Sequence, residues 1–166
     1  MYNEEVLKHF HKPHNYGKIE NPDGLGIVGN VVCGDVMWLY IKVGQNSKKE
    51  EIIKEVKFET FGCVAAIATS SAVTDLAKGK TLAEAMKITK DEIIDSLGDL
   101  PENKKHCSVL ANDALFEAIY DYYGKTGRGE KAGAQCLITP EMEKRHQHLS
   151  AEKDIIEERL QKQAAK

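Results

Sequence analysis

Three cysteines and one histidine of this chain are residue types that bind soft metal ions. Cys33 lies in Val-Val-Cys-Gly-Asp, Cys63 ends Thr-Phe-Gly-Cys, and Cys107 directly follows His106. Thiolate and imidazole ligands suit zinc or the iron of an iron-sulfur cluster, whereas calcium and magnesium prefer oxygen ligands. The sequence therefore predicts a site for a soft metal at these residues.

The spacing of the cysteines means that only tertiary structure can bring them together. Cys33 and Cys63 are 30 positions apart, and Cys63 and Cys107 are 44 positions apart. Gly34 lets the backbone turn, so that Cys33 and Asp35 could face one centre. Cys63 and Cys107 each precede an expected helix, whose positive end stabilises a thiolate. We expect these two thiols to be primed for ligation or reaction.

A set of three thiolates needs one more ligand, and both Asp35 and His106 are candidates. Electron-transfer clusters are usually held by four thiolates, so a mixed set indicates a metal centre that can leave. Two hypotheses stay open from the residues: a site that assembles or hands on a metal centre, and a structural zinc site. A thiol enzyme with Cys107 as nucleophile and His106 as base ranks last, because sequence neighbours rarely reach each other in that geometry.

The elements that must position these residues follow from local patterns. Asn3 can cap a helix that runs to about Phe10 and stops at Lys12-Pro13. Residues that favour β-structure predict an antiparallel meander of three strands at residues 27–32, 36–43 and 52–61.

Helical patterns dominate the rest of the chain. The apolar segment 64–78 predicts a buried helix that Gly79 ends. Apolar residues at helical spacing predict an amphipathic helix over residues 108–123, ended by Gly124. Between these helices two short ones are expected, and each has a capping box: Thr81 with Glu84, and Thr89 with Glu92.

The C-terminal residues differ in composition from the rest. After a Gly/Ala/Lys-rich link, Thr139-Pro140-Glu141 is a helix-start signal for a polar helix. Its apolar stripe is too narrow for an independent core, so a solvated helix or an oligomer contact is expected. We predict one domain at 1–127, with a linker and helical tail at 128–166. Cys136 in the tail is expected to be an inert thiol, and His9, His11 and His14 a surface cluster.

Composition excludes several classes of protein. The 166 residues are 42% hydrophobic, which is enough for one domain core. The net charge of −3 favours neither nucleic acid nor an anionic membrane as a partner. Neither a long apolar segment nor a secretory signal is present. We expect a cytoplasmic monomer or small homo-oligomer with reduced cysteines.

Three separate motifs of the chain resemble the IscU/NifU-type family of iron-sulfur cluster assembly scaffolds. They are Gly29-Asn30-Val31-Val32-Cys33-Gly34-Asp35, Phe58-Glu59-Thr60-Phe61-Gly62-Cys63, and Leu100-Pro101 through His106-Cys107. The segment 2–17 is also similar to the family's N-terminal segment, so that the resemblance spans roughly residues 1–127. It implies an α+β fold with a three-stranded antiparallel sheet packed by helices on one side.

The resemblance implies a scaffold and carrier, not an enzyme. Members of the family build a labile [2Fe-2S] cluster from iron and from persulfide sulfur that a cysteine desulfurase delivers. They pass the cluster to apo iron-sulfur proteins. An Hsp70-type chaperone, an iron donor and a ferredoxin are further implied partners, and zinc is a candidate occupant of the isolated protein.

The resemblance also implies roles for particular residues. Cys33, Cys63 and Cys107 match the cluster ligands, and Cys107 matches the persulfide acceptor. Asp35 matches an aspartate whose loss makes the cluster harder to release, and His106 matches an alternative ligand. One departure is Leu100-Pro101-Glu102-Asn103-Lys104, which stands where bacterial members often carry the chaperone-binding Leu-Pro-Pro-Val-Lys. Dependence on the chaperone therefore stays open.

Overall fold

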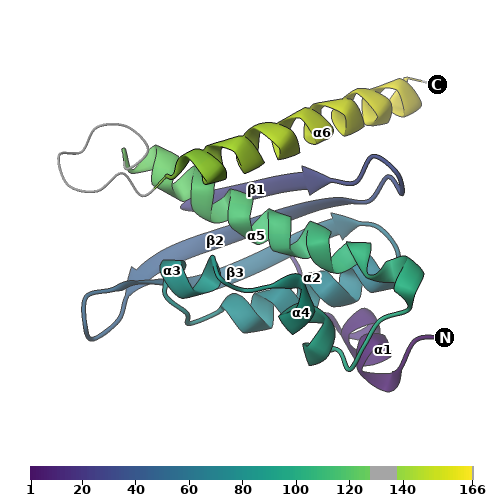
Figure 1. The fold of residues 1–166 in the computed structure, drawn as a ribbon, viewed down its shortest axis with the longest axis horizontal. Coiled ribbons are helices and arrows are strands. Elements are labelled where there is room, and N and C mark those ends of the chain that lie inside the picture. Colours follow the sequence, from purple (N-terminus) through teal and green to yellow (C-terminus); the bar gives the residue numbers. More distant parts are fainter. Residues whose placement is uncertain (128–137, 166) are drawn as a thin grey trace.

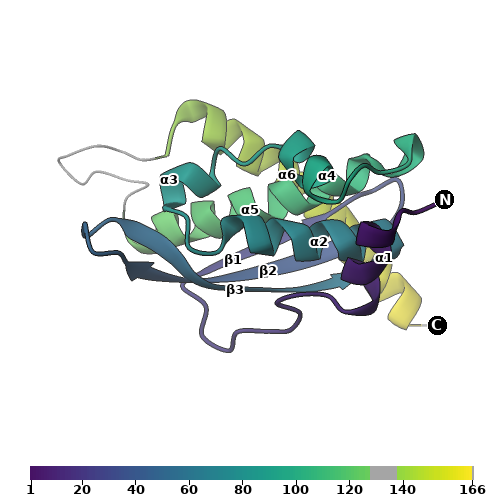
Figure 2. The ribbon, with the colours of Figure 1, turned by 90° about the horizontal axis from the view of Figure 1, so that it is seen from below.

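A three-stranded antiparallel sheet forms the base of the molecule. The structure is a computed structural model and describes residues 1–127 and 138–165. The sheet has the order β1-β2-β3, with β1 at Gly24–Gly29, β2 at Val36–Gln45 and β3 at Glu51–Phe61. Helices cover one face of this sheet (Figure 1, Figure 2). The predicted α+β class, with helices on one side, is confirmed.

Strand β1 lies earlier in the chain than the predicted strand at 27–32. It ends at Gly29 because the side-chain oxygen of Asn30 accepts hydrogen bonds from the N–H groups of Val32 and Cys33. Such local bonds compete with strand pairing. The β-favouring Val31 and Val32 are therefore in a turn.

The glycines that begin β1 have a packing role. Helix α5 (His106–Lys125) crosses β1 so closely that a Cβ atom on Gly24 would collide with the carbonyl oxygen of Ala118. A Cβ atom on Gly26 would collide in the same way with the carbonyl oxygen of Ala114. Glycine weakens a strand unless a close backbone approach requires it, as it does here.

Strands β2 and β3 pair along their whole length, from Val36 opposite Phe61 to Gln45 opposite Glu51. Their positions confirm the predicted strands at 36–43 and 52–61. One face carries fully buried side chains that form the core with α2 (Val64–Ala77) and α5: Met37, Leu39, Ile41, Val56 and Phe58. Helix α2 is buried as predicted, and Gly79 follows it with a φ of +82°.

The remaining helices of the domain begin largely where the sequence predicts. Helix α1 (Glu4–His11) is capped by Asn3, whose side chain accepts a hydrogen bond from the N–H of Val6. Both predicted capping boxes are present, at the starts of α3 (Leu82–Ala85) and α4 (Lys90–Ser96). A 3-10 turn, Glu102–Lys104, leads into α5. Helix α5 is longer than predicted, since it begins at His106 and continues past Gly124 to Lys125.

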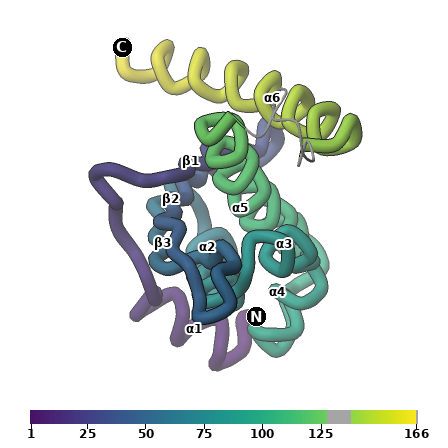
Figure 3. The backbone as a smooth tube through the Cα atoms, turned by 90° about the vertical axis from the view of Figure 1, so that its left-hand side faces the viewer, coloured from purple at the N-terminus to yellow at the C-terminus, as the bar shows by residue number. Residues whose placement is uncertain are grey.

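The C-terminal helix α6 (Pro140–Ala164) begins at the predicted signal, where the Thr139 side chain accepts a hydrogen bond from the N–H of Met142. It lies along α5 and β1 (Figure 1, Figure 3) and buries Leu149 and Ile156. A helix packed on its own domain differs from the solvated or oligomer-facing helix that was expected. Across the two described segments, we find no helix with the length and apolar character needed to cross a bilayer.

Candidate metal centre

The residues predicted as ligands lie at one end of the molecule, where several elements begin or end (Figure 1). The loop between β1 and β2 carries Cys33 and Asp35. Cys63 is the cap residue before α2, and His106 and Cys107 are the first residues of α5. The ends of two helices and of two strands thus build this region.

Three of the predicted ligands form a compact group. One ligand atom each of Asp35, Cys63 and Cys107 lies within 4.8 Å of the other two, and the sulfur atoms of Cys63 and Cys107 are 3.9 Å apart. Two thiolates bound to one tetrahedral metal at about 2.3 Å lie roughly 3.8 Å from each other. A disulfide bond would need about 2.05 Å. The sulfur spacing therefore fits a shared metal ion.

Asp35 supplies the strongest sign that this group can bind a cation. The residue is buried, and its Oδ2 atom has no hydrogen-bond partner among the described residues. Native proteins rarely leave a buried polar atom unpaired, since the penalty is about 1–3 kcal/mol and larger for a charged group. A cation bound by the two thiols would give this oxygen a ligand bond.

Gly62 makes room for the carboxylate. A Cβ atom at position 62 would lie 3.0 Å from Cγ of Asp35 and 2.8 Å from Cβ of Ala66. Contacts this short would force Asp35 or helix α2 to move. The glycine before Cys63 therefore lets the carboxylate of Asp35 approach the two thiols.

Cys33 lies beside this group and not within it. Its loop is closed by two backbone hydrogen bonds, from the N–H of Gly34 to the carbonyl of Asn30 and from the N–H of Asn30 to the carbonyl of Asp35. Gly34 has a φ of +77°, as the predicted turn requires. The turn directs Asp35 inward, while Cys33 is exposed. The sequence placed both residues at one centre, and the structure brings only Asp35 into the compact group.

His106 also lies at the border of the group. Its Nε2 atom is 3.7 Å from the sulfur of Cys107, and the residue is half-buried. The imidazole is thus close enough to exchange places with another ligand of a metal at Cys107. It is not one of the three residues whose ligand atoms lie within 4.8 Å of one another.

Burial controls the protonation of the thiols in the metal-free protein. Burial raises the pKa of the Cys107 thiol, and the neighbouring Cys63 raises it further. Partial burial also raises the pKa of the Cys33 thiol, although a hydrogen bond from the N–H of Asp35 opposes this effect. The positive end of the helix favours a reactive thiolate at Cys107, but the desolvation of this buried thiol outweighs that effect. Metal binding at Cys107 therefore releases a proton.

Two residues that the sequence did not single out as ligands lie near the thiols. The negative charge of Cys63 raises the pKa of Lys104, so the ammonium group of this half-buried lysine can balance thiolate charge. Burial raises the pKa of Tyr2, and the charge of Cys63 is the next contribution. Nothing in the spacing of Tyr2 marked it as a neighbour of the site.

A second compact group of possible ligands lies on another part of the molecule. Ligand atoms of His9, His14 and Asp75 are within 4.8 Å of one another. His9 is buried, whereas the sequence predicted a surface cluster of histidines. Nδ1 of His9 is 2.7 Å from Oγ of Ser71, and Nδ1 of His14 is 2.6 Å from Oδ2 of Asp75. This group is already joined by hydrogen bonds.

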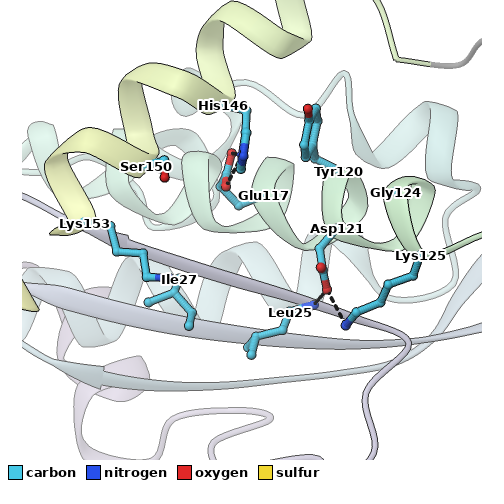
Figure 4. Close-up of a pocket in the computed structure, with 10 residues that line it drawn as sticks. All are labelled: Leu25, Ile27, Glu117, Tyr120, Asp121, Gly124, Lys125, His146, Ser150 and Lys153. Carbon is cyan, nitrogen blue, oxygen red and sulfur yellow. Dashed lines mark hydrogen bonds and ion pairs between the residues drawn. The ribbon is translucent and has the colours of Figure 1, made fainter. Parts of the chain in front are cut away.

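A cavity of about 540 Å³ lies apart from the thiols, between β1, α5 and α6 (Figure 4). Figure 4 shows the ion pair of Glu117 with His146 and that of Asp121 with Lys125 at its wall. The ten residues that line the cavity include no cysteine. It is a separate feature from the metal centre. Cys136 lies outside the described residues.

This α+β domain has two adjacent free thiols at one end, beside a buried carboxylate oxygen that has no hydrogen-bond partner among the described residues. These are the features of a metal-binding protein. A comparison with protein families makes this specific. The chain belongs to the family described as NifU-like N terminal domain, whose family model matches residues 1–129. The resemblance found in the sequence motifs is thereby confirmed.

Relatives and solved structures agree with this family. The chain is 56% identical over 131 residues to the iron-sulfur cluster assembly scaffold protein IscU 1 of Archaeoglobus fulgidus, covering 79% of this chain and 82% of the relative. It is 45% identical over 131 residues to the IscU scaffold protein of Aquifex aeolicus, with the same coverage. A NifU-like N-terminal structure from Brucella abortus shares the fold with a TM-score of 0.56 at 18% identity, covering 74% of this chain and 94% of that one.

Proposed function

We propose that this chain is a scaffold that assembles a [2Fe-2S] cluster and transfers it to apo iron-sulfur proteins. The observation that carries the proposal is the unpaired Oδ2 of Asp35, buried beside two thiols whose sulfur atoms are 3.9 Å apart. Its relatives are named as iron-sulfur cluster assembly scaffolds, which supports the same role. We assign this role to the domain at 1–127.

The ligand roles follow from the positions of the side chains. Cys63, Cys107 and Asp35 are close enough to hold one iron ion. A cluster with two irons and two sulfides is larger than one ion, so it needs ligands beyond this group. Cys33 and His106 lie at the border of the group and are the candidates. Cys33 is exposed, and its thiol lies beside Asp35, whose backbone N–H donates a hydrogen bond to it.

Sulfur enters by attack of a cysteine thiolate on the persulfide of a cysteine desulfurase. If Cys107 is the acceptor, its sulfur bonds to the outer sulfur of the donor, the donor's S–S bond breaks, and the donor leaves as a thiolate. Cys107 is 1% exposed and burial raises its pKa, so the segment before α5 must open for this step. Each transferred sulfur needs two electrons to become sulfide. On this proposal a ferredoxin supplies these electrons.

Release of the cluster depends on the mixed ligand set. Thiolates bind iron more strongly than a carboxylate does in soft sites, so the bond to Asp35 is the one that breaks most easily. An acceptor thiolate could then take the place of the carboxylate. On this proposal Asp35 makes the binding of the cluster temporary.

The chaperone-binding segment has a local structure that bears on its use. Pro101 is extended, but Glu102–Lys104 form a 3-10 turn. A chaperone groove that binds extended peptide would have to unwind this turn, which adds an ordering cost to binding. We propose that any Hsp70-type chaperone binds this chain more weakly than one with the Pro-Pro sequence.

A structural zinc module is the second candidate, because two thiols and a carboxylate also suit zinc. In such modules the metal replaces a hydrophobic core. Here a continuous core joins the sheet to α2 and α5, and the metal group lies at its end. We therefore expect the protein without metal to remain folded, which separates the two candidates.

Anaerobic reconstitution tests the proposal. Protein incubated with ferrous iron, cysteine and a desulfurase should develop the visible spectrum of a [2Fe-2S] cluster and lose it to apo-ferredoxin. Cys63→Ser should prevent cluster formation, and Cys136→Ser, outside the family match, is the control. A protein that stays colourless, or that unfolds when a chelator removes its zinc, would contradict the scaffold role.

A further inference from the structure

The C-terminal helix α6 contacts the loop that carries Cys33. The family match ends at residue 129, so α6, which begins at Pro140, is outside it. We propose that Arg159 and Ile156 of α6 are positioning residues that hold the Cys33 loop in place. For its effect on a cluster, this inference rests on the proposed function.

The N-terminal half of α6 is fixed on α5. The guanidinium of Arg145 pairs with the carboxylate of Asp113 at 2.5 Å and lies over the ring of Phe116. The next residue of α6, His146, pairs with the buried Glu117 at 2.8 Å (Figure 4). Charged groups that are partly buried and hydrogen-bonded hold elements in a defined register. These contacts therefore fix the orientation of α6 relative to α5.

The C-terminal half of α6 then passes over the loop between β1 and β2 (Figure 1). Ile156 is 3% exposed, and its Cδ1 atom fills the space that a Cβ atom of Gly29 would occupy. One turn later, the guanidinium of Arg159 donates a hydrogen bond of 2.7 Å to the carbonyl of Val31. One contact is thus made at Gly29, the last residue of β1, and the other at Val31 in the loop, two positions before Cys33.

Within the described residues, the other hydrogen bonds of this loop are internal to it. The Asn30 side chain and the backbone bonds of Asn30 close the turn internally, but they do not tie it to the rest of the fold. Val32 is 97% exposed and Cys33 is exposed as well. Segments with little buried surface open locally at low free energy. The contacts from α6 are therefore a large share of what holds the loop.

A held loop matters because Cys33 is outside the compact ligand group. A restrained loop loses less conformational entropy when Cys33 binds a cluster. Loss of the α6 contacts should make the loop more mobile and the Cys33 bond weaker. The cluster should then leave faster.

The first test needs no metal. Full-length Arg159→Ala and Arg159→Lys are compared with Lys162→Ala, which removes an ammonium group that pairs with Glu158 of the same helix. Hydrogen exchange of residues 30–35 in the metal-free protein should be about three- to tenfold faster in Arg159→Ala, as expected for one lost hydrogen bond. Arg159→Lys should restore part of the protection, and Lys162→Ala should match the wild type. Equal exchange in Arg159→Ala and wild type would overturn the inference.

The second test uses the loaded protein. Cluster loss to a chelator should be faster in Arg159→Ala than in Lys162→Ala, while the urea midpoint stays the same in both. If no variant assembles a cluster, the proposed function fails, and the exchange result still decides on the loop. If clusters form and leave at equal rates in all variants, the positioning role in release is refuted although the scaffold stands.

Discussion

Two groups of three potential metal ligands among the described residues are both compact, but they differ in their hydrogen bonds. In both, the ligand atoms lie within 4.8 Å of one another. The atoms of His9, His14 and Asp75 bond to one another or to Ser71. In the group of Asp35, Cys63 and Cys107, a buried carboxylate oxygen has no partner among the described residues. A buried ligand atom without a hydrogen-bond partner therefore indicates a metal site better than a short distance between ligand atoms does.

The histidine group has a structural explanation. The hydroxyl of Ser71 on α2 accepts a hydrogen bond from the backbone N–H of His14 and contacts Nδ1 of His9. Asn15 donates a further bond to the carboxylate of Asp75. These bonds tie helix α1 and the loop after it to α2. A metal ion would have to break them before it could bind.

The largest expected difference between the groups is in metal affinity. Cys63→Ser should lower the affinity for Co²⁺ by at least about 100-fold, because a thiolate ligand is lost. His14→Gln should leave the affinity unchanged. Titration with Co²⁺, followed by the thiolate-to-metal absorption band and by calorimetry, measures both. A comparable loss in His14→Gln would show that the histidines bind metal.

The second difference is in stability. Ser71→Ala should destabilise the metal-free protein by about 1–3 kcal/mol, since it leaves buried polar groups of the histidine group without a partner. Urea unfolding measures this change, and Ser47→Ala at an exposed turn is the matched control. A change in the free energy of unfolding below about 0.5 kcal/mol would mean that Ser71 contributes no more to stability than an ordinary surface residue does.

The third difference is in cluster retention. Asp35→Ala should retain a [2Fe-2S] cluster several-fold longer, because the most weakly bound ligand is removed. It should not destabilise the metal-free protein, since the buried Oδ2 atom of this carboxylate has no hydrogen-bond partner among the described residues. Transfer to apo-ferredoxin is timed by absorbance, with Asp75→Asn as the control from the histidine group. Identical transfer rates in Asp35→Ala and wild type would refute the role of this side chain.

The smallest difference is a dependence on pH. Burial lowers the pKa of His9, and the neighbouring His14 lowers it further. Below a pH of about 6.5, the unfolded chain binds a proton at this position that the folded protein does not, so stability falls as the pH falls. The urea midpoint should drop less between pH 7.5 and pH 5.5 in His9→Gln than in His11→Gln, which changes an exposed residue of the same helix. Equal drops would mean that His9 does not contribute.

The sequence predicted those parts of the fold that local patterns determine. The capping boxes of α3 and α4 and the start signal of α6 are decided by residues three or four positions apart, and all were found. The residues that favour β-structure also located β2 and β3. The position of β1 was wrong because Gly24 and Gly26 weaken a strand pattern, and only the distant helix α5 explains their presence.

The candidate site was predictable in its residue types and not in its geometry. Motif resemblance selected Asp35, Cys63 and Cys107, which the fold brings together. The outward position of Cys33 depends on the hydrogen bonds of Asn30, and the raised pKa of Cys107 on its burial. The docking of α6 depends on Arg145, His146 and Ile156, whose partners lie far away in the sequence.

The close crossing of α5 over β1 has a consequence for how this protein tolerates variation. Any side chain at Gly24 or Gly26 would push the helix backbone away from the sheet. Cys107 is in the first turn of that helix, so the displacement would reach the thiol from the opposite end of the element. In a saturation mutagenesis library selected for activity, substitutions at Gly24 and Gly26 should be depleted almost as strongly as substitutions at the cysteines.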